Sequence, residues 1–291
     1  MACVAPSPPE STRRFERPDG VALAIETFGA VGTPILFAHG FGQTRQAWTT
    51  TATALAGRGH RAVTYDARGH GDSDWRAGAP YTWEQMRDDL AAIARSQPAR
   101  PVLVGASMGG LVGLAAEGEY APLFRALVLV DVTPRWEPRG VDRILNFMRA
   151  HPDGFESLDA AAAAIAAYLP HRREQKSPDR LRGLLADHGD GRLRWHWDPR
   201  LIDELARGSE SYQPLLFDAA RRIRIPTLLI SGGASDVVSH DTIDEFLALV
   251  PHARHVRVAD ATHMIVGDDN AAFTRHVAGF LEEIEAKESL Q

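Results

Sequence analysis

The most informative stretch of this sequence is Pro101-Val102-Leu103-Val104-Gly105-Ala106-Ser107-Met108-Gly109-Gly110-Leu111. Its uninterrupted apolar run at 102–104 is typical of a parallel strand that is buried on both faces. A helical spacing of apolar residues begins at Leu111, so a sharp strand-to-helix turn should carry Ser107. Gly105 and Gly109 would allow this strained turn and a close approach of strand and helix. We therefore expect the Ser107 hydroxyl to project at the carboxyl edge of a sheet.

This turn would present Ser107 as a nucleophile. The backbone N–H of Met108, at the N-terminus of the helix, would point toward negative charge that forms beside the hydroxyl. The pattern Gly105-x-Ser107-x-Gly109 alone is also compatible with a glycine-rich helix start whose serine is incidental, or with a loop that cradles phosphate. The partners of Ser107 elsewhere in the chain decide between these interpretations.

Further apolar runs predict a mostly parallel sheet around this strand. An antiparallel pair is expected at 12–17 and 21–28, joined by the turn Pro18-Asp19-Gly20. Buried strands are expected at 34–38, 61–66, 125–130, 225–230 and 255–258. Helices are expected at 82–95, at 242–250 and in the closing segment, whose apolar positions form one stripe.

Two more loops carry a family resemblance. His39-Gly40-Phe41-Gly42 follows the strand at 34–38, and Asp66-Ala-Arg68-Gly-His70-Gly-Asp-Ser73 follows the strand at 61–66. Together with the serine turn, they closely resemble the α/β-hydrolase superfamily, in particular its soluble bacterial serine esterase and lactonase-like members, over roughly residues 12–285. The resemblance implies an α/β-hydrolase fold: a mostly parallel central sheet flanked by helices, with a helical cap inserted after the strand that ends at Asp131.

The resemblance also implies a catalytic triad in the chain order serine, acid, histidine, with each residue at the end of a strand. Ser107, Asp236 and His263 satisfy this order. Asp131 is a second candidate for the acid, because some hydrolases use the position at the end of the strand that follows the serine helix. We favour Asp236, which lies in the expected Gly-Gly-Ala-Ser-Asp loop.

The same resemblance assigns roles to the two loops. The N–H groups of Met108 and Phe41 would form the oxyanion hole. The side chains of Asp66, Arg68 and His70 would form either a reactive or metal-binding cluster or a hydrogen-bonded brace near the site. We favour the brace.

The pattern changes after Asp131. Residues 133–215 contain helical runs, expected at 141–149, 158–169, 178–186 and 199–207, and no strong parallel strand. We assign 133–215 to a helical cap, 12–132 and 216–291 to the α/β-hydrolase core, and 1–11 to a flexible N-terminal lead. The side chains of Trp48, Trp136, Trp195 and Trp197 are candidates for an aromatic wall around a substrate, the alternative being that tryptophans fill a small core in the cap.

Composition restricts the classes of function. The net charge of -6 argues against a nucleic-acid surface, and no apolar run approaches the ~20 residues that a membrane span needs. Segment 1–10 has no basic residue and no long apolar core, so we expect no signal peptide and a cytoplasmic protein. Cys3 is the only cysteine, which excludes an internal disulfide. We expect no metal and no cofactor, and the sequence leaves open whether the chain is a homodimer.

The predicted function is a serine hydrolase that cleaves a small-molecule carboxylic ester or lactone through an acyl-enzyme intermediate. Three alternatives remain open. A cofactor-free perhydrolase or haloperoxidase-like enzyme would use the same triad, and a carbon–carbon bond hydrolase would act on a diketone. A ligand-sensing receptor of this fold would keep the triad but turn over slowly or not at all.

Overall fold

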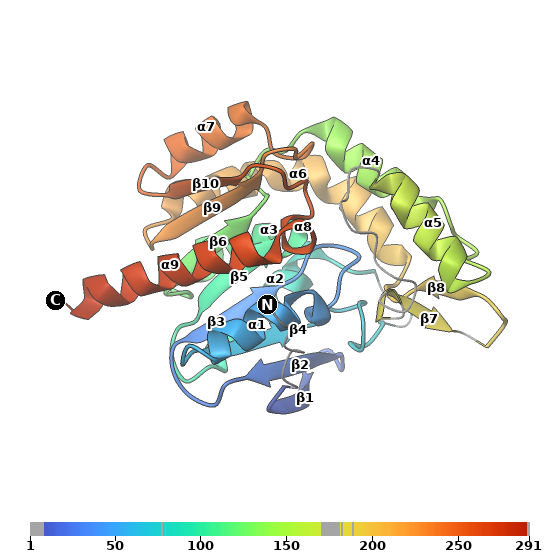
Figure 1. Cartoon of the computed structure of the whole chain (residues 1–291), viewed down its shortest axis with the longest axis horizontal. Coiled ribbons are helices and arrows are strands. Elements are labelled where there is room, and N and C mark those ends of the chain that lie inside the picture. The colour runs from blue at the N-terminus through green and yellow to red at the C-terminus, as the bar shows by residue number, and fades with distance from the viewer. Residues whose placement is uncertain are drawn as a thin grey trace.

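A central sheet organises the molecule (Figure 1). The computed structural model describes residues 9–76, 78, 80–169, 181, 183–187 and 189–289. The strands follow the order β1-β2-β4-β3-β5-β6-β9-β10 across the sheet. Their bounds are β1 Ser11–Glu16, β2 Ala22–Phe28, β3 Pro34–Ala38, β4 Arg61–Tyr65, β5 Val102–Ala106, β6 Ala126–Val130, β9 Thr227–Gly232 and β10 Arg254–Val258. Each predicted strand is therefore present, with ends that differ by at most two residues.

The direction of the strands creates the edge at which the site lies. β1 and β2 pair antiparallel with each other, and β2 pairs antiparallel with β4. From β4 to β10 every neighbouring pair is parallel. The carboxyl ends of β3, β5, β6, β9 and β10 consequently meet at one edge of the sheet.

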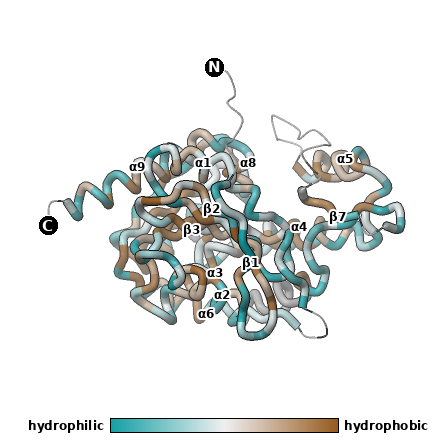
Figure 2. The backbone as a smooth tube through the Cα atoms, turned by 90° about the horizontal axis from the view of Figure 1, so that it is seen from below, coloured by the Kyte–Doolittle hydropathy of each residue, from teal (hydrophilic) through white to brown (hydrophobic). Residues whose placement is uncertain are grey.

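Helices cover both faces of the sheet, as the apolar strand residues require. On one face lie the short helix η1 (Arg45–Trp48), α1 (Thr49–Ala56), α8 (Ile265–Asp268) and α9 (Asn270–Ser289). On the other lie α2 (Trp83–Arg95), α3 (Met108–Tyr120), α6 (Arg200–Arg222) and α7 (His240–Leu249). Figure 2 shows apolar stretches around β2 and β3 in the middle of the molecule. Among the described residues, no helix is both long and apolar enough to cross a bilayer.

The chain between β6 and β9 extends beyond the end of the sheet (Figure 1). It forms α4 (Pro138–Arg149), α5 (Leu158–Tyr168), the antiparallel pair β7 (Leu185–Asp187) and β8 (Leu193–Trp195), and then α6. Predicted helices at 141–149 and 158–169 match α4 and α5. Of the helix expected at 178–186, residues 178–180 and 182 lie outside the described residues, and its last two residues belong to β7.

The last predicted helix of this region, at 199–207, is much longer in the structure. α6 continues through Pro214 to Arg222 and so crosses the domain boundary expected at residue 215. Its C-terminal half packs against α3 on the sheet, while its N-terminal end follows β8. One helix thus connects the segment beyond the sheet with the core.

Candidate active site

Ser107 occupies the strained turn between β5 and α3. Its φ of 48° and ψ of -120° lie outside the regions that L-residues favour. Glycine is required on both sides of the turn because neighbouring backbone leaves no room for a side chain. A Cβ at Gly109 would lie 2.4 Å from the carbonyl oxygen of Ala38, and a Cβ at Gly105 would lie 2.7 Å from the carbonyl oxygen of Gly109. The predicted tight turn is confirmed in its geometry.

His263 lies against the Ser107 hydroxyl. Its Nε2 is 3.1 Å from Ser107 Oγ, although the two residues are 156 positions apart. Its Nδ1 is 2.7 Å from a carboxylate oxygen of Asp131. Since the carboxylate can only accept a hydrogen bond, Nδ1 carries the proton and Nε2 is left to accept the proton of the serine hydroxyl. This is the arrangement that general-base activation of a serine needs.

Asp131, and not the predicted Asp236, is the residue that orients His263. The Asp131 side chain is fully buried at the end of β6, and its backbone has a φ of 49°. Besides His263 it accepts hydrogen bonds from the N–H of Gly232 at 2.8 Å and from the hydroxyl of Ser235 at 2.5 Å. These donors stabilise the ionised carboxylate in a buried position.

Asp236 points away from the histidine. Its carboxylate pairs with Arg143 of α4 at 2.7 Å, and both side chains are roughly 40% exposed. The cause is the course of the loop after β9: the Ser235 hydroxyl is directed at Asp131, while the next residue faces α4, which packs closely enough that a Cβ at Gly140 would lie 2.1 Å from the Asp236 carbonyl oxygen. The prediction that Asp236 contacts His263 is therefore wrong.

The loop after β3 reaches the serine from the other side. A Cβ at Gly40 would lie 3.3 Å from the Cβ of Ser107, so the backbone of this loop borders the hydroxyl. Within the described chain, the N–H of Phe41 has no protein acceptor, and the N–H of Met108 is the first of α3 and lacks an intrahelical partner. Two unpaired N–H groups beside a serine hydroxyl are suited to hold an oxyanion.

Two apolar cavities meet at Ser107, Phe41 and Ile144. The first, which we call the Met108 cavity, measures about 110 Å³, and its walls include Met108, Val132, Trp136, Leu145, Tyr212 and Val237. The second, the His263 cavity, measures about 130 Å³, and its walls include Phe147, Ile165, Tyr168, Trp195, His263 and Met264. No Asp, Glu, Lys or Arg side chain lines either cavity within the part of the chain that the structure describes.

The four tryptophans proposed from the sequence have different positions. Trp136 lines the Met108 cavity and Trp195 lines the His263 cavity. Trp197 is buried behind Phe41, with ring centroids 4.9 Å apart, and lines neither cavity. Trp48 is fully buried on the opposite face of the sheet, where it packs on Phe37 and Phe273. The prediction of a substrate contact is wrong for Trp48, because η1 directs the indole into the core beneath α9.

Several residues that line the cavities are not among those predicted from the sequence. Trp83 and Met86 of α2, with Tyr212 and Leu216 of α6, border the Met108 cavity. Met86 follows the apolar spacing of its helix, which by itself is typical of a core position. Trp83, three residues before Met86, extends the apolar face of the helix to its first turn, at the edge of the sheet. This position was the signal in the sequence that Trp83 could line a cavity.

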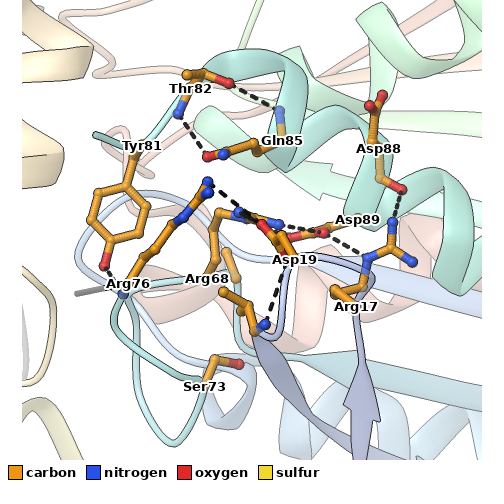
Figure 3. A network of polar contacts seen from close by, with 12 residues as sticks. Arg17, Asp19, Arg68, Ser73, Arg76, Tyr81, Thr82, Gln85, Asp88 and Asp89 are labelled. Atoms are coloured by element: carbon orange, nitrogen blue, oxygen red, sulfur yellow. Dashed lines mark hydrogen bonds and ion pairs between the residues drawn. The ribbon is translucent and has the colours of Figure 1, made fainter. Parts of the chain in front are cut away.

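The loop 66–73 is a polar brace. Arg68 donates to both carboxylate oxygens of Asp89 at 2.7 and 2.8 Å and to Asp19 at 2.9 Å, and Figure 3 shows its guanidinium between these two residues. Asp66, fully buried, accepts from the backbone N–H of Arg45 at 2.6 Å and pairs with its guanidinium. Among the described residues, no group of three or more His, Cys, Asp or Glu side chains could hold a metal ion.

The chain is similar to known proteins over most of its length. Residues 35–276 match the family model described as Alpha/beta hydrolase family. The chain is 28% identical to a 3-hydroxybutyrate-oligomer hydrolase from Cupriavidus necator, over 83% of this chain and 86% of the relative. It is also 28% identical to an esterase from Mycobacterium tuberculosis, over 92% and 89%.

A solved structure resembles the whole molecule. The crystal structure of an E-2-(acetamidomethylene)succinate hydrolase superposes with a TM-score of 0.82 at 25% identity, and the match covers 94% of this chain and 99% of that one. The similarity thus includes the segment between β6 and β9 as well as the sheet.

Proposed function

The chain belongs to the alpha/beta hydrolase family, and from this premise we propose that it is a serine hydrolase that cleaves carboxylic esters or lactones through an acyl-enzyme intermediate. One observation carries the proposal: a continuous hydrogen-bonded chain from Ser107 Oγ through both ring nitrogens of His263 to the buried carboxylate of Asp131. We assign the triad to these three residues. Segment 133–215 is proposed as the cap over the site.

The proposed reaction follows from the position of each group. Ser107 Oγ attacks the carbonyl carbon while its proton passes to His263 Nε2, and the N–H groups of Phe41 and Met108 hold the oxyanion. Collapse of the tetrahedral intermediate expels the alcohol, which takes the proton from Nε2. Water then gives a proton to the same nitrogen and attacks the carbonyl carbon of the acyl-enzyme. When this second intermediate collapses, Nε2 returns the proton to Ser107 Oγ, which releases the acid and restores the serine.

The two cavities divide an ester substrate at its scissile bond. The leaving alcohol must lie beside the imidazole that protonates it, so we assign the alcohol to the His263 cavity. The acyl group then occupies the Met108 cavity, next to the proposed oxyanion donor. Because the described walls of both cavities carry no charged side chain, they favour an uncharged substrate with an apolar acyl group.

The relatives support ester chemistry without fixing the substrate. One is named as an esterase and another as a hydrolase of 3-hydroxybutyrate oligomers. An oligomer of a hydroxy acid, a lactone and a simple ester share the carboxylic ester bond on which the proposed triad acts. No specific feature of the described site favours a perhydrolase, a carbon–carbon hydrolase or a receptor over this assignment.

The test is hydrolysis of p-nitrophenyl esters from acetate to decanoate and of a lactone panel, with Ser107→Ala in parallel. We expect turnover by the wild type and none by the alanine variant. The proposal would be rejected if the wild type hydrolysed none of the esters and lactones, or if Ser107→Ala were fully active. Peracid formation from acetate and peroxide, or cleavage of a diketone, would then identify the alternative reaction.

Two cavity variants sharpen this test. Leu145→Trp narrows only the Met108 cavity and should shift the preferred acyl chain to a shorter length, whereas Ile165→Trp narrows only the His263 cavity. Ile165→Trp should leave the acyl preference unchanged but lower the rate for butyrate esters of longer alcohols. The opposite pattern would show that the cavities are assigned in the wrong order.

A further inference from the structure

His196, from the segment between β6 and β9, reaches the loop that carries Phe41. It follows directly after β8, and its side chain is 6% exposed. Nδ1 lies 2.9 Å from the backbone N–H of Gly71, and Nε2 lies 3.3 Å from the carbonyl oxygen of Gly42. Because the N–H of Gly71 can only donate, Nδ1 must accept, so the ring proton is on Nε2 and is donated to Gly42.

Two other buried imidazoles hold the same loop from within the core. His39 accepts the N–H of Ala67 at 2.9 Å through Nε2, so its Nδ1–H faces the carbonyl oxygen of Gly40 at 2.9 Å. His70 Nε2 accepts the N–H of Gly42 at 3.4 Å. The peptide groups on both sides of Phe41 are thus fixed by side chains, and His196 is the member of this set that comes from outside the core.

The two residues after His196, Trp197 and Asp198, also pack against the core. The ring of Trp197 packs on the ring of Phe41. The N–H of Asp198 donates to the carbonyl oxygen of Gly69 at 2.8 Å, and its carboxylate accepts the Tyr81 hydroxyl at 2.9 Å. Residues 196–198 therefore contact both the loop after β3 and the loop after β4, at the carboxyl edge of the sheet.

We propose that His196 is a positioning residue, which couples docking of the cap to the placement of the Phe41 N–H in the oxyanion hole. His196 lines neither cavity at Ser107, so it acts through Gly42 and not by contact with substrate. The inference rests on the proposed function. If His196 positions Phe41, loss of its hydrogen bond to Gly42 should weaken binding of the transition state more than binding of the substrate.

Three substitutions separate the two hydrogen bonds of His196. His196→Asn places its amide oxygen near the position of Nδ1, which keeps the Gly71 contact and loses the Gly42 contact. His196→Gln places its amide nitrogen near the position of Nε2, which keeps the donor to Gly42. His196→Phe keeps the ring volume and loses both contacts. A role in positioning Phe41 requires that glutamine preserves activity better than asparagine.

The readouts are kcat, KM, and inhibition by an alkyl trifluoromethyl ketone, whose serine adduct carries an oxyanion. We expect His196→Asn and His196→Phe to lower kcat by about tenfold with KM little changed, and to raise the inhibition constant of the ketone by a similar factor. We expect His196→Gln to stay near the wild type in all three. Equal kinetics for asparagine and glutamine, or a change confined to KM, would overturn the proposal.

Hydrogen–deuterium exchange of the peptide that covers residues 40–43 provides a measurement that does not depend on turnover. Exchange should accelerate in the asparagine and phenylalanine variants and remain at the wild-type rate in the glutamine variant. Unchanged exchange in all three variants would contradict the proposed coupling even if the enzyme is active. The wild type and Ser107→Ala report separately on the proposed hydrolase function.

Discussion

Asp131, the residue directly after β6, accepts a hydrogen bond from Nδ1 of His263 at 2.7 Å and lies completely out of contact with solvent. The two residues are 132 positions apart in the chain. The strand that follows the serine helix, and not the next strand along the sheet, therefore supplies the carboxylate on which His263 depends for its tautomer. This relationship changes which acid a mutational study should target.

Asp131→Asn should lower kcat by a factor on the order of 10³–10⁴. The Gly232 N–H donates to one carboxylate oxygen, whereas Ser235 and His263 share the other. Since a backbone N–H can only donate, the amide oxygen of asparagine would face Gly232 and its NH₂ group would face His263 and the Ser235 hydroxyl, which can turn to accept. Nδ1 would then have to accept, and the proton would move to Nε2, which could no longer accept from Ser107. Steady-state hydrolysis of a p-nitrophenyl ester measures the effect.

Asp236→Asn is the matched control for that substitution. It removes an ion pair whose members are both about 40% exposed, and such pairs contribute about 0–1 kcal/mol to stability. Its activity should stay within about twofold of the wild type. An inactive Asp236→Asn beside an active Asp131→Asn would restore the assignment that the sequence favoured.

The sequence could locate the serine and histidine because each stands at a recognisable loop after a strand. It could not choose between the two acids, since β6 and β9 are adjacent parallel strands that end at the same edge. The choice depends on the turn of the loop after β9, which directs Ser235 toward Asp131. Such a turn is set by packing against α4 and has no signature in local residue patterns.

The region between β6 and β9 was also predicted from the sequence only in part. α4 follows from apolar spacing, and α5 follows from its run of alanines, which favour helix, and from Ser157, which caps it. The β7–β8 hairpin was missed, although Gly189 and Gly191 with φ of 79° mark a turn between short strands. Its strands are too short to carry a periodic pattern, so the glycines were the signal to use.

The strain at Ser107 predicts a gain of stability when it is relieved. Residues in sparsely populated backbone regions cost about 1–3 kcal/mol, and glycine adopts such a conformation without penalty, at a smaller cost in unfolded-state entropy. Ser107→Gly should therefore unfold with a free energy about 1 kcal/mol higher than Ser107→Ala, which removes the same hydroxyl but keeps a Cβ. Urea unfolding of the two inactive variants compares them directly, and equal midpoints would mean that the turn is not strained.

The close packing of the serine turn predicts a large loss of stability for Gly109→Ala. The added methyl group would lie 2.4 Å from the backbone oxygen of Ala38, so either β3 or α3 must move. We expect a loss of at least about 3 kcal/mol in the free energy of unfolding. Gly279→Ala, in α9 and with nothing within 4 Å of the new Cβ, is the control and should stabilise the protein by up to about 1 kcal/mol. Similar effects for both substitutions would contradict the packing argument.

Burial of His196 predicts a loss of stability in acid. Burial lowers the pKa of His196 from its usual 6.5 to about 4, so the unfolded chain binds a proton more readily than the folded one. The contribution of this group is fully present above pH 6.5 and is lost as the pH falls toward 4. Linkage gives a total of roughly 3 kcal/mol for a shift of this size.

His196→Gln removes the titrating group and isolates this contribution. Burial also lowers the pKa values of His39 and His70, but both remain in the variant, so their acid sensitivity is common to the two proteins. Urea unfolding at a series of pH values should give a free energy that falls more steeply below pH 6.5 for the wild type than for the variant. The two curves should run parallel above pH 6.5, where His196 is neutral in both the folded and the unfolded chain. Parallel curves at every pH would mean that His196 takes up a proton in the folded protein as easily as in the unfolded one, and hence that its contacts with Gly42 and Gly71 do not require the neutral ring.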